Sequence, residues 1–95
     1  MIRLRWTRRA SVHLDDIGRH IAENNPAAAG RVVKRIIDLV SNLSEQPKMG
    51  RSGRVKGTRE LIVPEFPYII AYREHAQEVQ ILAVFHALRR WPTKL

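Results

Sequence analysis

The helix that decides the fold is encoded by residues 25–43, NPAAAGRVVKRIIDLVSNL. Asn25 is suited to cap this helix, and Pro26 suits its first turn because the missing N–H would be unpaired there anyway. We expect the helix to end before Pro47, since the residue preceding a proline is driven out of helical conformation. Its apolar side chains recur every three or four residues, with Ile37 flanking them. They are Ala29, Val32, Val33, Ile36, Val40 and Leu43.

A second amphipathic helix is predicted upstream, over about residues 8–23. Thr7 offers a capping hydroxyl at its start. Its apolar positions, spaced for one helix face, are Ala10, Leu14, Ile17 and Ile21. The segment Asn24-Asn25-Pro26 separates the two helices. A connection this short predicts an antiparallel helix hairpin.

Strand-like patterns surround the hairpin. Residues 68–72 are apolar at every position, which is typical of an inner strand. The short turns expected at 64–67 and 74–78 make the last three strands an antiparallel meander. The four strand-like segments are residues 2–6, 60–63, 68–72 and 79–85.

These elements predict an α+β fold with the order β-α-α-β-β-β. The helices should pack on one face of a four-stranded sheet, because their apolar stripes have nothing else to bury against. The 95 residues suit a single domain spanning 1–95. Because Ile36 lies in the middle of the stripe, we expect Ile36→Asp to unfold the domain.

Composition limits the classes of function. Seventeen Lys and Arg against nine Asp and Glu give a net charge of +8, which favours nucleic acid, the ribosome or an acidic protein as partner. The absence of cysteine excludes disulfides, Cys-based zinc sites and thiol catalysis, and fits a reducing cytosol. No signal-peptide or membrane-spanning pattern is seen, so we expect a cytoplasmic protein without membrane contact.

Residues 48–59 combine five positive charges with three glycines and no acidic residue. They are predicted to form a loop leading into a strand. The loop is either a solvated connector or a surface that contacts a partner or phosphate groups. The residues predicted to bind a partner are Arg51, Arg54 and Lys56 here, and Arg90 and Trp91 near the C-terminus. Trp91 alternatively docks the tail on the core.

Short motifs occur in order along nearly the whole chain. WTRRA at 6–10, LDDI at 14–17 and NPAAA at 25–29 are followed by GRSGRVKGTREL at 50–61, PYIIAYR at 67–73 and ILAVFHALRRWP at 81–92. As a set, these motifs resemble the ParE/RelE superfamily of type II toxin–antitoxin toxins, in particular its ParE-like branch. No single motif is specific, but their order and spacing are.

The resemblance implies a growth-inhibiting toxin that is neutralised by a cognate antitoxin, whose acidic C-terminal tail would wrap it. Operator DNA would be bound only through the antitoxin. Ala28, Val33 and Ile37, at the edge of the helical stripe, are candidates for staying partly open to such a partner. No cofactor and no metal is implied.

Two mechanisms share this fold, and fold alone does not choose between them. ParE-type members poison DNA gyrase without catalytic residues, whereas RelE-type members cleave mRNA on the ribosome. The resemblance places RelE-type lysines on the strand at 59–63, which has none here, and an arginine where this chain has Ile69. A terminal catalytic tyrosine also has no counterpart after Tyr72. These departures favour gyrase poisoning over an mRNA endonuclease.

One nuclease-like feature remains, because His86 stands where some relatives carry a catalytic histidine. Histidine titrates near neutrality and suits either acid or base. If the chain is a nuclease, the predicted catalytic residues are His86, Arg59, Arg73 and Arg89.

Each of these residues also has a structural interpretation. His86 is otherwise a strand-end residue bonded to backbone, and Arg59 and Glu60 form a structural pair. Arg73 stacks on a tyrosine. His13 and His20 lack a third ligand at metal-binding spacing, so a metal site is not predicted there.

Overall fold

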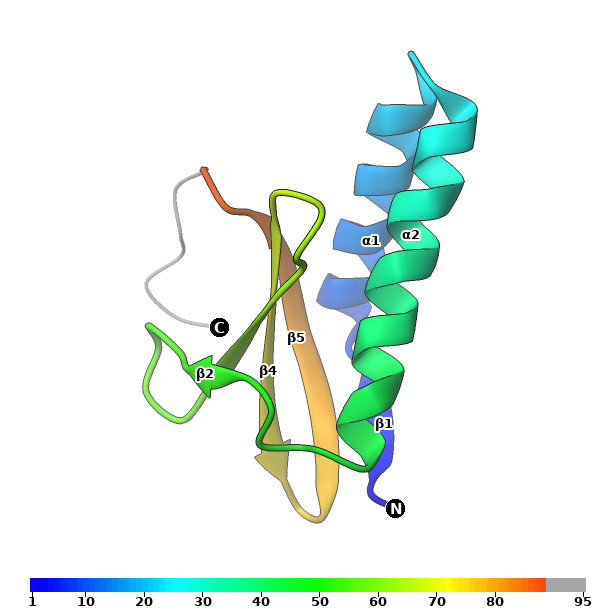
Figure 1. Cartoon of the computed structure of the whole chain (residues 1–95). Coiled ribbons are helices and arrows are strands. Elements are labelled where there is room, and N and C mark those ends of the chain that lie inside the picture. The colour runs from blue at the N-terminus through cyan, green and yellow to red at the C-terminus, as the bar shows by residue number, and fades with distance from the viewer. Residues whose placement is uncertain (89–95) are drawn as a thin grey trace.

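The computed structural model describes residues 1–88 of the chain, and residues 89–95 lie outside the described part. Two helices pack against one side of a single sheet, as Figure 1 shows. The elements, in chain order, are β1 (Arg3–Trp6), α1 (Arg8–Ala22), α2 (Pro26–Ser41), a 3-10 turn η1 (Asn42–Ser44), β2 (Arg51–Ser52), β3 (Arg59–Ile62), β4 (Tyr68–His75) and β5 (Glu78–His86). The predicted α+β fold, with a helix hairpin on a sheet, is confirmed.

Both helices begin at the residues that the sequence indicated. The Thr7 hydroxyl accepts a hydrogen bond from the backbone N–H of Ala10 at 3.2 Å, and the Asn25 side chain accepts one from Ala28 at 3.1 Å. Each cap satisfies a donor that the first helical turn leaves unpaired. Within the described residues, neither helix is long and apolar enough to cross a membrane.

The sheet has the strand order β1-β5-β4-β3-β2. The last four strands pair antiparallel, as the predicted meander requires, while β1 pairs with β5 in parallel. β4 lies in the middle of the sheet, which explains why residues 68–72 are apolar on both faces. The structure adds the short β2 from within the segment predicted as a loop, so the sheet has five strands rather than four.

The turn between β4 and β5 is tighter than predicted. Only Ala76 and Gln77 separate the strands, and both have positive φ, at 52° and 63°. Such left-handed pairs match the twist of a two-residue hairpin. Neither residue is of a type that favours this conformation, so the sequence did not indicate how short the turn is. β4 therefore continues to His75.

The core lies between the hairpin and the sheet. The largest fully buried side chains are Tyr72, Ile36, Leu43, Ile70, Ile81, Val40, Val63 and Val79. Ile36 is 0% exposed, as its central place in the stripe predicted, and Leu39 joins the core although the predicted stripe omitted it. Ile37 is 43% exposed, and Ala28 and Val33 are half-buried, so the edge of the stripe does stay partly open.

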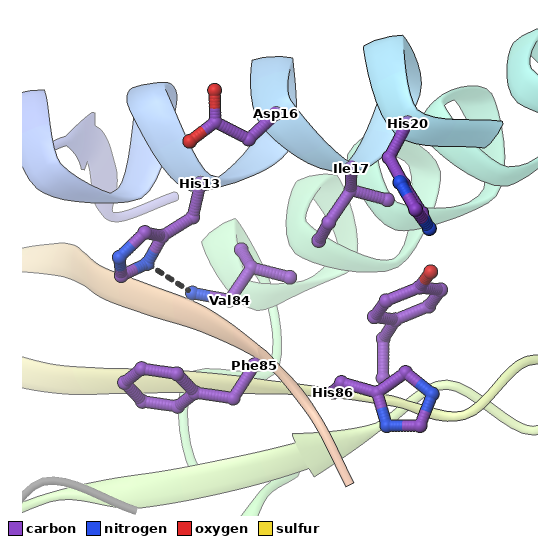
Figure 2. Close-up of a pocket in the computed structure, with 8 residues that line it drawn as sticks. His13, Asp16, Ile17, His20, Val84, Phe85 and His86 are labelled. Carbon is purple, nitrogen blue, oxygen red and sulfur yellow. Dashed lines mark hydrogen bonds between the residues drawn. The ribbon is translucent and has the colours of Figure 1, made fainter. Parts of the chain in front are cut away.

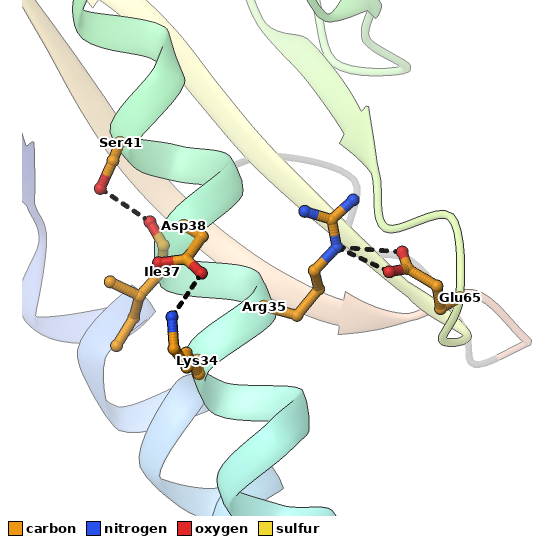
Figure 3. Close-up of polar contacts among 6 residues, drawn as sticks. All are labelled: Lys34, Arg35, Ile37, Asp38, Ser41 and Glu65. Atoms are coloured by element: carbon orange, nitrogen blue, oxygen red, sulfur yellow. Dashed lines mark hydrogen bonds and ion pairs between the residues drawn. The ribbon is translucent and has the colours of Figure 1, made fainter.

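Polar contacts hold α2 in place. Figure 3 shows Arg35 reaching from α2 to Glu65 in the turn between β3 and β4, where its Nε lies 2.8 and 3.0 Å from the two carboxylate oxygens. Lys34 and Asp38 form an ion pair one turn apart on the exposed side of α2. The Arg35–Glu65 contact joins the hairpin to the end of the sheet that carries His86.

The hydroxyl of Tyr72 anchors the chain that leads from the helices into β2. It donates to the carbonyl of Pro47 and accepts from the N–H of Gly50, both at 2.8 Å. A Cβ at Gly50 would lie 2.7 Å from this hydroxyl, so glycine is needed there for the close approach. Burial raises the pKa of Tyr72 above its usual value of 10.0, which keeps the hydroxyl proton in place.

Candidate functional site

A cleft of about 510 Å³ opens between α1 and the C-terminal half of β5 (Figure 2). It exists because β1 pairs with β5 only as far as Ile81, so the rest of β5 faces α1 instead of a strand. We call it the histidine cleft, because three of the chain's four histidines line it. Its lining residues are His13, Asp16, Ile17, His20, Tyr68, Val84, Phe85 and His86.

His13 closes one end of the histidine cleft. Its Nδ1 accepts the backbone N–H of Val84 at 3.2 Å, a donor that no neighbouring strand takes up. This bond requires an unprotonated Nδ1. Burial lowers the pKa of His13 below 6.5 and Arg9 lowers it further, while Asp16 acts in the opposite direction. His13 is therefore neutral at pH 7 and serves β5 as a substitute for a strand neighbour.

His86 and His20 lie on opposite walls of the histidine cleft (Figure 2). The Nδ1 of His86 accepts from the N–H of Leu88 at 3.2 Å, and its ring lies nearly perpendicular to that of Tyr68, with centroids 5.6 Å apart. His20 is exposed on α1, with its Nδ1 3.5 Å from a carboxylate oxygen of Glu23. In residues 1–88, no group of three or more His, Cys, Asp or Glu is arranged to hold a metal ion.

The structure does not bring His86 together with Arg59 and Arg73. His86 pairs across β4 with Tyr68, whereas Arg59 pairs with Tyr72, four residues further along the same strand. At about 3.3 Å per residue, that separation is roughly 13 Å along the sheet. Arg73 lies one residue further still. Arg89 lies outside the described residues, so its place relative to His86 stays a prediction.

The expected pair of Arg59 with Glu60 is wrong. Adjacent residues on a strand point to opposite faces, so each finds a different partner. Arg59 Nη1 donates to the carbonyl of Gly50 at 2.8 Å, on the side of the sheet that the helices cover. Glu60 points to the other side, where its side chain is 2% exposed.

Glu60 organises the basic segment around β2. Its Oε1 accepts from Arg51 Nη2 at 2.9 Å, and its Oε2 accepts from the backbone N–H of Arg54 at 2.9 Å. Two of the predicted partner-binding arginines are thus held on one buried carboxylate. Lys56 is exposed in the connection between β2 and β3. Arg90 and Trp91 lie outside the described residues.

Arg73 is bonded to a glutamine rather than stacked on a tyrosine. Its Nε donates to Gln80 Oε1 at 2.7 Å, Gln80 Nε2 donates to Glu78 at 2.8 Å, and Glu78 accepts from the Nε of Arg5 at 2.9 Å. This row crosses β4, β5 and β1. Tyr72 directly precedes Arg73, but its ring lies in the core on the opposite face of the sheet.

The sequence did not indicate the hydrogen-bonded row that Gln80, Glu78 and Arg5 form with Arg73. Gln80 gave a usable signal, since it is the single polar residue in an apolar strand and is 4% exposed. A buried amide needs hydrogen-bond partners, and the neighbouring strands had to supply them. Which residues those were depended on the register of β1 and β4 against β5.

The histidine cleft offers acid–base chemistry without a cation. Imidazole side chains are the commonest general acids and bases in enzymes, and His20 and His86 bring two of them to the histidine cleft. Cleavage of RNA also needs a positive group to stabilise the charged phosphorane. None of the eight described residues that line the cleft is lysine or arginine, and one of them is Asp16.

The chain matches a known family over most of its length. Residues 4–91 match the family described as "ParE toxin of type II toxin-antitoxin system, parDE". The Sinorhizobium fredii protein "Putative toxin Y4kP" is 50% identical over 93 residues, covering 98% of this chain and 96% of the relative. "Toxin RelE2" of Caulobacter vibrioides is 33% identical over 89 residues, covering 94% and 99%.

A solved structure gives the same result for the fold. The structure described as "Chromosomal ParDE TA system from P. aeruginosa" superposes with a TM-score of 0.83 and 31% sequence identity, over 90% of this chain and 96% of that chain. The match therefore covers the helix hairpin and the sheet together.

Proposed function

The chain belongs to the ParE toxin family of type II toxin–antitoxin systems, and from that membership we propose that it inhibits growth by poisoning DNA gyrase. The resemblance read from the sequence motifs is confirmed at the level of the superfamily. Membership implies a cognate antitoxin as partner. We further propose that it acts in the cytoplasm and reaches operator DNA only through the antitoxin.

One observation supports gyrase poisoning over RNA cleavage: the cleft that holds His86 has no lysine or arginine among its described lining residues. Of the arginines predicted to assist His86, the two within the described residues bond other groups. Arg59 bonds the carbonyl of Gly50, and Arg73 bonds Gln80. Ile69, at the position where the RelE-type resemblance implies an arginine, is 5% exposed. A toxin that acts by binding needs no such assembly.

A supercoiling assay tests the proposal. Purified toxin should inhibit supercoiling by gyrase and accumulate cleaved DNA as its concentration rises. Toxin mixed beforehand with its antitoxin is the control and should leave gyrase active. The proposal fails if gyrase is unaffected at high toxin excess while the same preparation stops translation in vitro.

A ribosome-dependent mRNA endonuclease is the second candidate. It is favoured by His20, Tyr68 and His86 lining one cleft. In this case His86 would be catalytic, with Arg89 as the predicted source of positive charge.

Mapping of mRNA 5′ ends after induction separates the two candidates. An endonuclease should produce new 5′ ends within coding regions, and His86→Ala should abolish both the cleavage and the growth arrest. Intact transcripts together with full toxicity of His86→Ala would eliminate the endonuclease. Circular dichroism of the variant should confirm that it folds, because His86 is only half-buried.

A further inference from the structure

The side of the sheet away from the helices carries a set of arginines from distant parts of the chain. Residues alternate between the two faces of a strand, so those that pair with Glu78, Gln80 and Glu60 share the face opposite the core. We call this set the arginine face. It consists of Arg3, Arg5, Arg51, Arg54 and Arg73. All five are exposed.

The carboxylates on this face lie beneath the guanidinium groups. The Glu60 side chain is 2% exposed and that of Glu78 is 17% exposed, against 49–51% for Arg5, Arg51 and Arg54. Five arginines against two carboxylates leave a net charge of +3. The remaining seven acidic residues lie on the helices, in the turns beside them or on the helix-covered side of β4: Asp15, Asp16, Glu23, Asp38, Glu45, Glu65 and Glu74.

The inner acceptors orient the guanidinium groups. Arg5 and Arg73 each donate from Nε, to Glu78 and Gln80 respectively. Within residues 1–88, no hydrogen bond is recorded from their terminal Nη groups. A guanidinium held at Nε presents its two outer nitrogens as a fork, which matches the oxygens of a phosphate. Because the side chains are already positioned, less conformational entropy is lost on binding.

The width of the arginine face indicates what it binds. Arg5 on β1 and Arg51 on β2 lie at opposite edges of the five-stranded sheet. Four steps of about 4.8 Å separate those edges by roughly 19 Å. Between Arg73 and Arg51, two strand steps and two residues along the strand amount to roughly 12 Å. A single extended acidic peptide is narrower than this, whereas the major groove of B-DNA is about 12 Å wide between its phosphate chains.

We propose that the arginine face binds the sugar–phosphate backbone of nucleic acid. The contact is independent of base sequence, because guanidinium groups fixed on a sheet surface reach phosphates rather than base edges. It deepens the proposed function, on which it rests, since both candidate targets hold nucleic acid: DNA in gyrase and RNA on the ribosome. The arginine face would then hold the toxin against the nucleic acid within the target complex.

Fluorescence anisotropy of the full chain with labelled nucleic acid tests this proposal. The probes are a 20-base-pair duplex DNA and a 20-nucleotide single-stranded RNA, each measured from low to physiological salt. The double variant Arg5→Gln/Arg73→Gln should bind duplex DNA at least about tenfold more weakly at low salt. The slope of log affinity against log salt concentration should become less negative by about two, since each phosphate contact contributes about 0.9 to that slope on B-DNA.

The matched control is Arg19→Gln/Arg31→Gln, which removes the same charge from the exposed side of the hairpin. Arg19 also pairs with a carboxylate, that of Asp15, but from a terminal nitrogen and with both side chains about 70% exposed, so it lacks the inner acceptor that holds Arg5. The control should stay within about twofold of the unmodified chain. A further variant, Arg5→Lys/Arg73→Lys, should regain only part of the affinity, because lysine keeps the charge but loses both the fork and the Nε contact to the inner acceptor.

Three results would overturn the proposal. One is an equal loss in the control variant, which would show that total charge alone drives binding. Another is the absence of salt-dependent binding to either probe. The third is a poly-glutamate peptide that competes at concentrations far below those of either nucleic acid, which would assign the arginine face to an acidic protein. A preference for duplex DNA supports a gyrase–DNA contact, and a preference for RNA supports a ribosomal one.

Failure of this inference is distinguishable from failure of the proposed function. If the arginine face binds DNA but gyrase is unaffected, the inference stands and gyrase poisoning falls. If gyrase is poisoned equally by the unmodified chain and by Arg5→Gln/Arg73→Gln, with no loss of DNA binding, the arginine face has no part in either. Thermal unfolding of each variant should confirm an intact fold, because all four substituted arginines are exposed.

Discussion

The histidine cleft and the arginine face differ in how their polar side chains are held. In the cleft, His13 and His86 accept hydrogen bonds from backbone N–H groups in and just after the C-terminal half of β5. On the arginine face, side chains bond other side chains across strands, over buried Glu60 and Gln80. The cleft thus presents neutral rings bonded to backbone, whereas the arginine face presents permanent cations that side-chain acceptors hold in position. The first arrangement suits proton chemistry and the second suits binding of a polyanion.

The largest expected effect comes from the core that supports both regions. Ile36→Asp should destabilise the domain by about 4 kcal/mol or more, because it places an unpaired carboxylate at a position that is 0% exposed. Chemical denaturation should show a chain largely unfolded without denaturant. Ile37→Asp is the matched control, since Ile37 is 43% exposed, and it should cost less than about 1 kcal/mol. A folded Ile36→Asp variant would mean that the hairpin does not need this stripe.

The second-largest expected effect concerns the buried carboxylate beneath the arginine face. Glu60→Ala should lower the free energy of unfolding by about 2–3 kcal/mol, since Arg51 and the N–H of Arg54 lose a buried charged acceptor. Urea denaturation measures the loss. Glu65→Ala removes an exposed partner of Arg35 and should cost about 0–1 kcal/mol. Equal losses would show that burial of Glu60 adds nothing.

A smaller effect is expected in the segment that leads from the helices into β2. Tyr72→Phe keeps the ring but leaves the Gly50 N–H and the Pro47 carbonyl without their partner, at a cost of about 1–2 kcal/mol. Amide hydrogen exchange at Gly50 should be faster in the variant than in the unmodified chain. Exchange at the amides of α1 should be equally slow in both. Unchanged exchange at Gly50 would contradict the role assigned to this hydroxyl.

The smallest effect belongs to the cleft and depends on pH. The folded state lowers the pKa of His13 below 6.5, so folding favours the neutral imidazole. Its contribution to stability is present in full above pH 6.5 and is lost as pH falls through the folded pKa. In His13→Gln, the amide oxygen can still accept from Val84 but does not titrate. Between pH 7.5 and 5.5 the unmodified chain should therefore lose more stability than His13→Gln. Parallel pH profiles would exclude the bond as the cause.

The sequence predicted the local elements well for an identifiable reason. Helix periodicity, the Thr7 and Asn25 caps and the apolar run at 68–72 depend on residues close together in the chain. The turn expected at 74–78 is present but shorter than predicted, because neither Ala76 nor Gln77 is of a residue type that marks a two-residue turn. β2 was missed because two exposed residues, Arg51 and Ser52, carry no detectable pattern.

The candidate sites were only partly predictable from the same pattern. His86 lines the cleft, and Arg51 and Arg54 from the predicted basic segment share the acceptor Glu60, while their roles stay predictions. The partners were not foreseen, because Arg59 and Glu60 point to opposite faces and Arg73 meets Gln80 from the neighbouring strand. The companions of His86 in the cleft come from α1, far away in the sequence.

The sequence by itself determined the helix hairpin, the meander, the excess of positive charge and the resemblance to ParE-like toxins. Only the tertiary structure decided which charges meet. It placed β1 parallel to β5 and ended that pairing at Ile81, which opened the histidine cleft. It also set the register that brings Arg5, Arg73 and Arg51 to one face over buried acceptors. The physical reason is that periodicity arises between neighbours in the chain, whereas cross-strand contacts depend on pairing between distant segments.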